Sequence, residues 1–197
     1  MSRFTFVHAA DLHLGSGFKR LELSDRRVAT ALREATFAAL RRIVDLCVER
    51  RAAFLLLAGD LYDAADRSLR AVAFLHEQLQ RLDAAGIETF VVNGNHDPAD
   101  GWQPRFAWPE SVHWFPAGRV AQRSVIRDGE EIARIYGYSY AHREVTEAVA
   151  PRMRREPGVP YAIGLLHANV GGQPGHDDYA PATVDELAAT GMDYWAL

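Results

Sequence analysis

Short apolar runs alternate with longer segments in which apolar residues recur every three or four positions over the first half of the chain. A short apolar run is typical of a buried strand, and the three-to-four spacing is typical of a helix with one apolar face. The order strand, helix, strand, helix, strand favours crossover connections and a mainly parallel sheet. The expected strands are residues 4–8, 53–58 and 87–92, and the expected helices are residues 24–51 and 68–85.

Each expected helix carries an apolar face and recognisable ends. Ser24 is a candidate N-cap for the first helix, and Gly86 directly follows the second, where a helix C-terminus favours glycine. Cys47, the single cysteine, is interpreted as a small core residue that cannot form an internal disulfide. The apolar faces consist of Val28, Leu32, Ala35, Ala39, Ile43 and Leu46 in the first helix, and of Ala71, Leu75, Leu79 and Leu82 in the second.

The second half of the chain has a different texture. Residues 98–111 are rich in Pro and Trp and predict an ordered loop. Short strands follow, with Asp128-Gly129 as a hairpin turn, and they predict a second, partly antiparallel sheet. No Ser/Pro/Gly-rich linker or internal repeat divides the sequence, so residues 1–197 are expected to form one domain. The expected elements are strands 112–115, 120–127, 132–138 and 161–166, and a charged helix 143–155.

The composition is that of a globular protein. A length of 197 residues suffices for one well-cored domain, and 48% hydrophobic with 24% charged residues excludes disorder. The net charge of −4 does not indicate a nucleic-acid binder by bulk electrostatics, although two bound divalent cations would bring the molecule near neutrality. No apolar run is long enough to span a bilayer, and Met1 leads straight into a strand. A cytoplasmic protein is therefore expected.

Polar side chains follow four of the expected strands at the points where the strands end. Each motif alone reads as an ordinary turn or structural histidine, but their repetition at the carboxyl ends of parallel strands predicts one shared site. Carboxylate, imidazole and amide oxygen donors suit Mn²⁺, Fe²⁺ or Zn²⁺ better than Ca²⁺ or an iron–sulfur cluster. The residues are Asp11 and His13, Asp60 and Asp63, Asn95 and His96, and His167.

These motifs, in this order, resemble those of the calcineurin-like metallophosphoesterase superfamily, and the resemblance spans nearly the whole chain. Within the superfamily, residues 9–14 and 193–197 resemble the SbcD-type DNA repair exonucleases. Residues 18–19 and 176–181 are most similar to the YhaO branch. The resemblance implies a four-layer α/β/β/α sandwich that holds two divalent metal ions, with Mn²⁺ expected and Fe²⁺ or Zn²⁺ as alternatives.

The resemblance also implies a role for each residue of the site. Asp60 is expected to bridge the two metal ions, with Asp11 and His13 completing one side and Asn95 and His167 the other. Such a pair of ions lowers the pKa of a shared water and neutralises charge that develops on phosphorus.

His96 and Asp63 are expected to be catalytic rather than metal ligands. His96 would protonate the leaving alkoxide or stabilise the transition state, and Asp63 would orient the His96 ring. Bacterial members of the nuclease branch commonly carry Asp at the position of Asp63, and archaeal and eukaryotic members often carry His.

The resemblance implies a DNA exonuclease or endonuclease subunit that hydrolyses phosphodiester bonds in DNA repair. DNA and an SbcC-like or YhaN-like ATPase are the expected partners, and the full-length protein is compatible with a homodimer; no membrane is involved. Alternatives are a phosphodiesterase or phosphatase acting on small molecules or proteins, and a non-catalytic scaffold that recruits an ATPase to DNA.

One departure from the family pattern concerns the last residues. In the family, a segment like residues 193–197 runs directly into Gly-His-x-His, which supplies the last ligand to each metal, and this sequence stops at Leu197. The chain is therefore expected to be a fragment without that motif and without the downstream capping region. Such a fragment would bind metal weakly and turn over poorly, because each ion has lost an imidazole.

Several other residues have structural interpretations. His8, inside the first strand, is expected to be a hydrogen-bonded core residue, and His176 and Asp177 are weaker candidates for substrate contact. Three tryptophans are interpreted as residues that anchor the loop to the core rather than as platforms on which bases stack. Three arginines are interpreted as a solvated helical face rather than as a binding surface for a phosphate backbone. These residues are Trp102, Trp108 and Trp114, and Arg152, Arg154 and Arg155.

Overall fold

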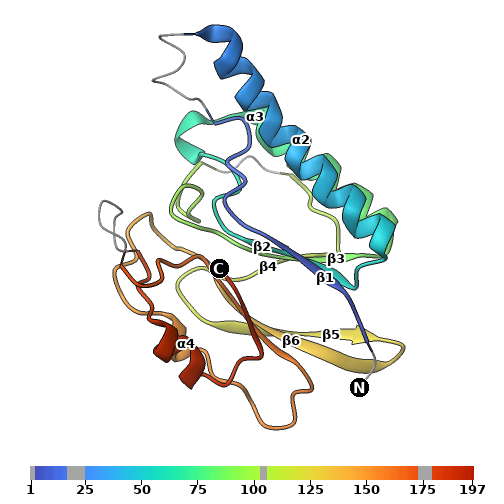
Figure 1. Ribbon diagram of the computed structural model, residues 1–197, viewed down its shortest axis with the longest axis vertical. Coiled ribbons are helices and arrows are strands. Elements are labelled where there is room, and N and C mark those ends of the chain that lie inside the picture. The colour runs from blue at the N-terminus through green and yellow to red at the C-terminus, as the bar shows by residue number, and fades with distance from the viewer. Residues whose placement is uncertain (1–2, 17–24, 103–105, 173–178) are drawn as a thin grey trace.

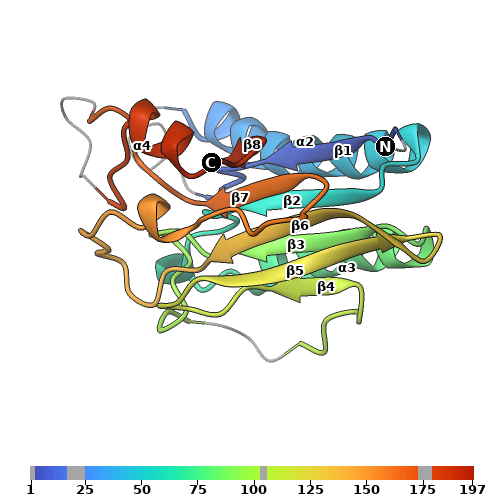
Figure 2. The ribbon, with the colours of Figure 1, turned by 90° about the horizontal axis from the view of Figure 1, so that it is seen from below.

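Two four-stranded sheets face each other in the computed structural model, which describes residues 3–16, 25–102, 106–172 and 179–197. Two long helices cover the outer face of the first sheet, and a short helix lies on the outer side of the second (Figure 1). The strands of the two sheets run over each other, with β7 beside β2 and β6 beside β3 (Figure 2). The expected α/β/β/α sandwich is confirmed.

The four strands of the first sheet are all parallel and follow the order β1-β2-β3-β4. The register pairs Ala9 with Leu57 and Ala58 with Val92, so the first three strands end at one edge. The elements of this half are β1 (Phe6–Ala9), α2 (Arg26–Arg50), β2 (Phe54–Ala58), the 3-10 turn η1 (Ala64–Asp66), α3 (Leu69–Ala84), β3 (Glu88–Val92) and β4 (Val112–Trp114).

The second sheet has the order β5-β6-β7-β8, with an antiparallel hairpin followed by parallel strands. The hairpin turns at Asp128-Gly129, where both residues have positive φ, as the sequence predicted. The elements are β5 (Ala121–Arg127), β6 (Glu130–Tyr138), the 3-10 turn η2 (Ala150–Arg152), β7 (Ala162–Leu166), α4 (Val184–Ala189) and β8 (Tyr194–Ala196).

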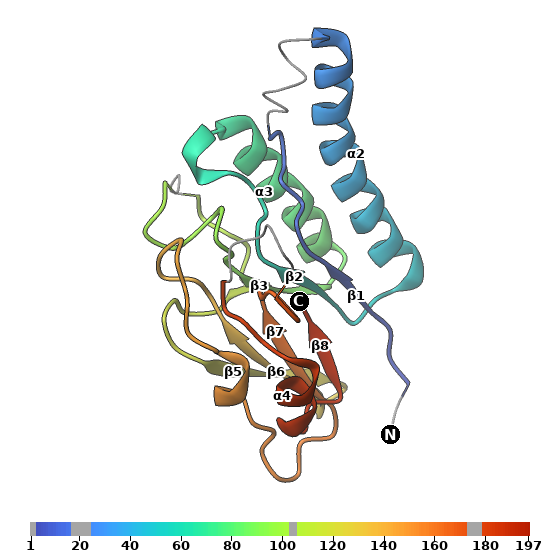
Figure 3. The ribbon, with the colours of Figure 1, turned by 60° about the vertical axis from the view of Figure 1, so that its left-hand side comes forward.

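Three apolar layers hold the four structural layers together, and β2 shows how. Leu55 and Leu57 face the helices, whereas Phe54 and Leu56 face the second sheet, because successive side chains of a strand point to opposite faces. All five residues of β2 are buried, as its continuous apolar run predicted. Each such side chain contributes roughly 1.5–3 kcal/mol by leaving water. A third layer packs the outer face of the second sheet against α4 (Figure 3).

The buried face of α2 differs from the predicted one. Val28, Leu32 and Leu46 are 44%, 37% and 40% exposed. The helix carries apolar residues at three-to-four spacing on two faces, and only packing against the sheet decides between them. Asp25 caps the helix by accepting hydrogen bonds from two backbone N–H groups, and Ser24 lies outside the described residues. The residues that face the sheet are Ala29, Phe37, Leu40, Val44 and Cys47.

The prediction for α3 is confirmed, including its inner face and the Gly86 that follows it with φ +69°. Burial raises the pKa of the Cys47 thiol to about 11, which fits an unreactive core residue. Within the described residues, no helix is both long enough and apolar enough to span a membrane.

Two predictions for the second half are wrong. The strand at residues 112–115 was assigned to the second sheet, but β4 pairs with β3 in the first. A three-residue strand carries too little pattern to show which sheet edge it extends. The helix expected at 143–155 is reduced to the turn η2, because Pro151 lacks the N–H that a helix running through it would need.

Candidate metal centre

The loops that follow β1 and β2 are joined by backbone hydrogen bonds. The N–H groups of Asp11, His13 and Leu14 donate to the carbonyls of residues 59–61 over 3.2, 2.9 and 2.9 Å. Asp11, His13 and Asp60 all have positive φ, a conformation that non-glycine residues adopt rarely and that clusters at functional sites. The backbone therefore fixes the directions of three donor side chains at one edge of the sheet.

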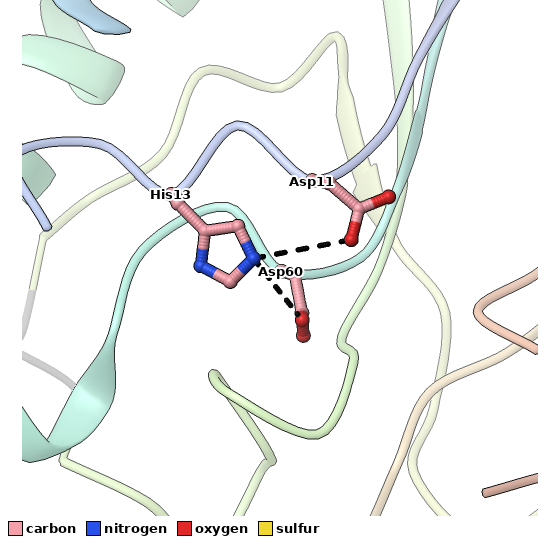
Figure 4. Close-up of side chains that lie close together, drawn as sticks. All are labelled: Asp11, His13 and Asp60. Carbon is pink, nitrogen blue, oxygen red and sulfur yellow. Dashed lines mark ion pairs between the residues drawn. The ribbon is translucent and has the colours of Figure 1, made fainter. Parts of the chain in front are cut away.

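Those three side chains converge (Figure 4). His13 Nε2 lies 3.5 Å from Asp60 Oδ2 and 3.9 Å from Asp11 Oδ1, and the ligand atoms all lie within 4.8 Å of one another. The Asp60 side chain is 4% exposed, whereas that of Asp11 is 61% exposed. A buried carboxylate between two imidazoles is costly without a compensating charge, so this geometry fits a cation.

The other side of Asp60 meets His167 and Asn95. His167 Nε2 is 3.5 Å from Asp60 Oδ2, the same oxygen that faces His13, and 3.0 Å from Asn95 Oδ1. His167 Nδ1 donates to the Ala58 carbonyl at 3.0 Å, which leaves Nε2 as an acceptor in the neutral ring. Two acceptors that face each other need a proton or a metal ion between them. One Asp60 oxygen thus faces both halves of the predicted ligand set.

His96 stands beside these donors without joining them. Its Nδ1 lies 3.5 Å from Asp63 Oδ2, and its ring meets that of His13 edge-on at 4.8 Å between centroids. Its backbone N–H donates to Asp60 Oδ1 at 2.9 Å. Asp63 Oδ1 accepts from the Ala65 N–H at the start of η1. The anchored Asp63 therefore faces the His96 ring, an arrangement that suits the role assigned to it.

Asp97 holds the loops together, and the sequence analysis gave it no role. Its Oδ1 accepts from the backbone N–H groups of Gly94 and Asp60 at 2.7 and 3.2 Å, and its Oδ2 accepts from that of Leu61 at 3.0 Å. Burial raises the pKa of Asp97 to about 6, while the hydrogen bonds from Gly94 and Leu61 oppose that rise. The signal available in the sequence was an acidic residue directly after Gly-Asn-His.

Glycine is required where the three loops approach one another. A Cβ on Gly94 would lie 2.3 Å from Asp60 Oδ1 and 2.9 Å from His167 Cδ2. A Cβ on Gly59 would lie 2.8 Å from His167 Cβ, and Gly59 also has φ +89°. Both glycines let the two sheets meet at the donors, because a Cβ at either position would collide with Asp60 or His167.

The donors line an open cavity of about 770 Å³. Its further walls come from the second sheet, and sequence reasoning did not place them there. Tyr140 is fully buried and donates its hydroxyl to the His167 carbonyl at 2.8 Å, and burial raises the pKa of that hydroxyl. Tyr140 and Arg143 follow β6, which runs parallel to β7 and therefore ends at the same edge. The walls are Tyr140, Arg143, Ala168, Asn169, Val170, Tyr179 and Leu197.

Most residues given structural interpretations lie away from this cavity. His8 is half-buried and bonds Tyr194 at 3.2 Å, and burial lowers its pKa. Trp102, Trp108 and Trp114 pack against the core beside the helices, as predicted. His176 and Asp177 lie outside the described residues. Of the predicted solvated arginines, Arg152 stacks over Tyr138, whereas Arg155 bonds Asp193 and the Val159 carbonyl.

The sandwich, with mixed carboxylate, imidazole and amide donors at its strand ends, is that of a metallophosphoesterase. The sequence profile of the calcineurin-like phosphoesterases matches residues 4–196, so the chain belongs to that family.

Three proteins with similar sequences show which members of the family the chain resembles. The chain is 44% identical over its whole length to the uncharacterized metallophosphoesterase YhaO of Bacillus subtilis, of which it covers 48%. It is 28% identical over 64% of its length to the DNA double-strand break repair protein Mre11 of Thermoplasma acidophilum, covering 32% of that protein. The Mre11 of Aeropyrum pernix is 32% identical over 46% of the chain, which covers 20% of it. The chain thus spans about half the length of YhaO and a smaller share of the two Mre11 proteins.

Proposed function

We propose that the protein is a metal-dependent nuclease subunit that hydrolyses phosphodiester bonds of DNA in repair, working with an SbcC-like or YhaN-like ATPase. The observation that carries the proposal is the position of Asp60 Oδ2, which lies 3.5 Å from both His13 Nε2 and His167 Nε2. That placement suits a carboxylate shared by two metal ions. The likeness to Mre11 proteins supports DNA as the substrate.

The residues present fit two divalent ions, for which Mn²⁺ is proposed. Bound ions would supply a nucleophilic water and would neutralise charge on the phosphoryl oxygens. Asp11 and His13 would hold one ion, Asn95 and His167 the other, and Asp60 both. The Ala58 carbonyl keeps the proton on His167 Nδ1, so Nε2 stays available as a ligand.

His96 carries the proton chemistry in this proposal. Its Nδ1 faces Asp63, so its Nε2 is free to give a proton to the leaving alkoxide, and Asp63 stabilises the charged ring. Leu197 lies in the cavity wall, so residues that follow this position in a longer chain would enter at the metal centre. That placement suits the predicted Gly-His-x-His. A homodimer and the ATPase contact belong to such a longer chain.

The test separates metal binding from proton transfer. We expect Asp60→Asn to weaken Mn²⁺ binding, measured by calorimetry, by more than about tenfold. His96→Asn should keep Mn²⁺ affinity but lower kcat on DNA by about 10²–10⁴-fold. His76→Asn, which alters a ring that bonds the Ala107 carbonyl and lines neither pocket at the site, is the matched control. Hydrolysis of DNA by His96→Asn at the wild-type rate would contradict the assignment.

The same assay decides between the candidate functions. Single- and double-stranded DNA and bis(p-nitrophenyl) phosphate are compared in this chain and in a longer form that continues through Gly-His-x-His. We expect the longer form to bind Mn²⁺ more tightly and to cut DNA. Cleavage of the small diester with DNA untouched would favour the phosphodiesterase, and absence of metal binding in both forms would leave only the scaffold.

A further inference from the structure

A second pocket lies on the far side of His96 from the metal donors. It has a volume of about 300 Å³ and shares Asn95, His96 and Arg143 with the larger cavity. The shared residues place the two spaces next to each other, so a ligand long enough to pass His96 can reach both. Its other walls are Asp63, Ala64, Ala65, Arg67, Pro98, Gly101 and Trp102.

Two exposed arginines line this pocket, and the described residues offer neither of them a partner. Among the described residues, neither the Arg67 nor the Arg143 guanidinium has a hydrogen-bond or ion-pair partner. Asp63 is the one acidic residue in the described lining, and its oxygens already meet the Ala65 N–H and the His96 ring. The pocket thus presents two planar cations with five donors each to a solvent-filled space, an arrangement that suits an anion with several oxygens.

The backbone holds both arginines in place. Arg67 is the cap of η1 and has φ +47°, a left-handed conformation that turns the chain at the pocket wall. The loop that carries Arg143 is joined to the loop after β3, because Ala99 and Asp100 donate their N–H groups to the Tyr140 and Ala141 carbonyls at 2.9 and 3.1 Å. The exposed Asp100 carboxylate, which could otherwise attract an arginine, bonds His142 at 2.7 Å.

Trp102 adds an aromatic wall. Trp102 is partly buried against the core and also lines the pocket. Stacking of a base on such a ring contributes about 1–3 kcal/mol and does not depend on the base. A cationic pocket with an aromatic wall combines the two features that single-stranded nucleic acids use for binding. A small diester or a monoester offers neither a second phosphate nor a second base to this space.

We propose that the pocket of Arg67, Arg143 and Trp102 binds the nucleotide next to the scissile phosphate of a nucleic-acid strand. The arginines hold its phosphate, and Trp102 lies against its base. The inference rests on the proposed nuclease function and deepens it, because it makes a polynucleotide rather than a small phosphoester the preferred substrate. The strand would pass His96 between the two pockets, which places that ring beside the bond to be cut.

The test compares Arg67→Gln and Arg143→Gln with Arg127→Gln. Arg127 is an exposed arginine at the hairpin end of β5, opposite the strand ends that form the site, so its replacement changes net charge equally. Binding of a fluorescein-labelled single-stranded oligonucleotide is followed by anisotropy over a salt series. Each pocket variant should bind about tenfold more weakly, with the slope of log K against log[salt] reduced by about 0.7, whereas Arg127→Gln should match the wild type.

Catalysis gives a second readout on the longer form with Mn²⁺. The loss of kcat/KM on the oligonucleotide should exceed the loss on bis(p-nitrophenyl) phosphate by about tenfold. Arg143→Lys should recover the salt slope more than Arg143→Gln, because a lysine keeps the charge but not the planar fork. Circular dichroism melts verify that each variant is folded.

The inference requires three results. The pocket variants must bind the oligonucleotide more weakly than Arg127→Gln does. Their loss of kcat/KM must also be larger on the oligonucleotide than on the small diester, since an equal loss would place the arginines at the scissile phosphate. The salt slopes must also separate the pocket variants from the control. If the wild type hydrolyses DNA while any of these conditions fails, the inference alone is wrong. If the wild type hydrolyses only the small diester and does not bind the oligonucleotide, the proposed nuclease function fails with it.

Discussion

The two sheets contribute to the site in different ways. The first sheet supplies most donors from three tight loops, which backbone hydrogen bonds and Asp97 lock to one another. The second sheet supplies His167 and the cavity walls from longer, irregular segments. His167 is itself oriented by the first sheet, through the Ala58 carbonyl. One sheet therefore fixes the positions of the metal donors, and the other shapes the space in front of them.

That difference indicates that the loops carrying the metal donors and the segments around them have different roles. Loops locked to a buried parallel sheet hold ligands precisely, which metal binding requires. Residues 144–160 can vary in length and sequence without moving Asp60 or Asn95, because the backbone hydrogen bonds described for them stay within this segment or join residues 180 and 190. We therefore infer that the donor loops preserve the reaction, and that the side chains around them, Arg67 and Trp102 from the first sheet and Arg143 from the second, select among phosphoesters. Four substitutions test how far this holds for the stability of the two halves.

The largest effect is expected for Asp97→Ala. It removes the acceptors of three backbone N–H groups in two loops, those of Asp60, Leu61 and Gly94, and leaves them buried. We expect the free energy of unfolding to fall by about 4 kcal/mol, because hydrogen bonds to a charged acceptor contribute more than neutral ones and unsatisfied buried donors are costly. Urea denaturation followed by circular dichroism measures it.

The control for this substitution is Asp66→Ala, an exposed carboxylate on η1. It should change the free energy of unfolding by less than about 0.5 kcal/mol. A loss below about 1 kcal/mol for Asp97→Ala would mean that the loops of the first sheet hold their positions without the carboxylate. The comparison between locked and variable loops would then lose its main support.

An intermediate effect is expected from the helices that cover the two sheets. Leu40 in the 25-residue α2 is fully buried, and Leu187 in the six-residue α4 is 8% exposed. We expect Leu40→Ala to cost about 3 kcal/mol and Leu187→Ala about 2 kcal/mol, since both leave cavities but the shorter helix can collapse more easily. Leu32→Ala, on the exposed face of α2, should cost less than about 1 kcal/mol. Equal losses for Leu40→Ala and Leu32→Ala would contradict the observed orientation of α2.

The sequence was most informative where local pattern and local geometry coincide. The apolar run 53–58 specifies a buried strand, and Gly59-Asp60 after it specifies a turn with a donor, so the carboxyl end of β2 was predicted to the residue, as was that of β3 at Val92. The side of α2 that faces the sheet was not predictable, because Val28 and Leu32 satisfy the same helical spacing as Leu40 and Val44. Only the sheet beneath the helix distinguishes the two faces.

In the second half of the chain, the sequence predicted the structure less well. Charged residues at 143–155 have helical spacing, but Pro151 and contacts such as that of Arg155 with Asp193 hold them in an irregular path. Tyr140 and Arg143 reach the site only because β6 and β7 are parallel, and a strand that follows a hairpin gives no sign of its second neighbour. Pairings between distant segments decide these placements, and no short motif records them.

The smallest effect is expected for Tyr140→Phe, which tests the link between the two sheets at the site. The hydroxyl donates to the His167 carbonyl, and the ring meets the His167 ring at 5.8 Å between centroids, a contact that phenylalanine keeps. We expect a loss of about 1 kcal/mol in the free energy of unfolding, the contribution of one neutral hydrogen bond. Tyr138→Phe is the matched control, because among the described residues the Tyr138 hydroxyl has no hydrogen-bond partner, and it should cost less than about 0.5 kcal/mol. If Tyr140→Phe instead weakens Mn²⁺ binding as much as loss of a ligand does, the second sheet positions the metal donors as strongly as the first, and the division of roles between the sheets is wrong.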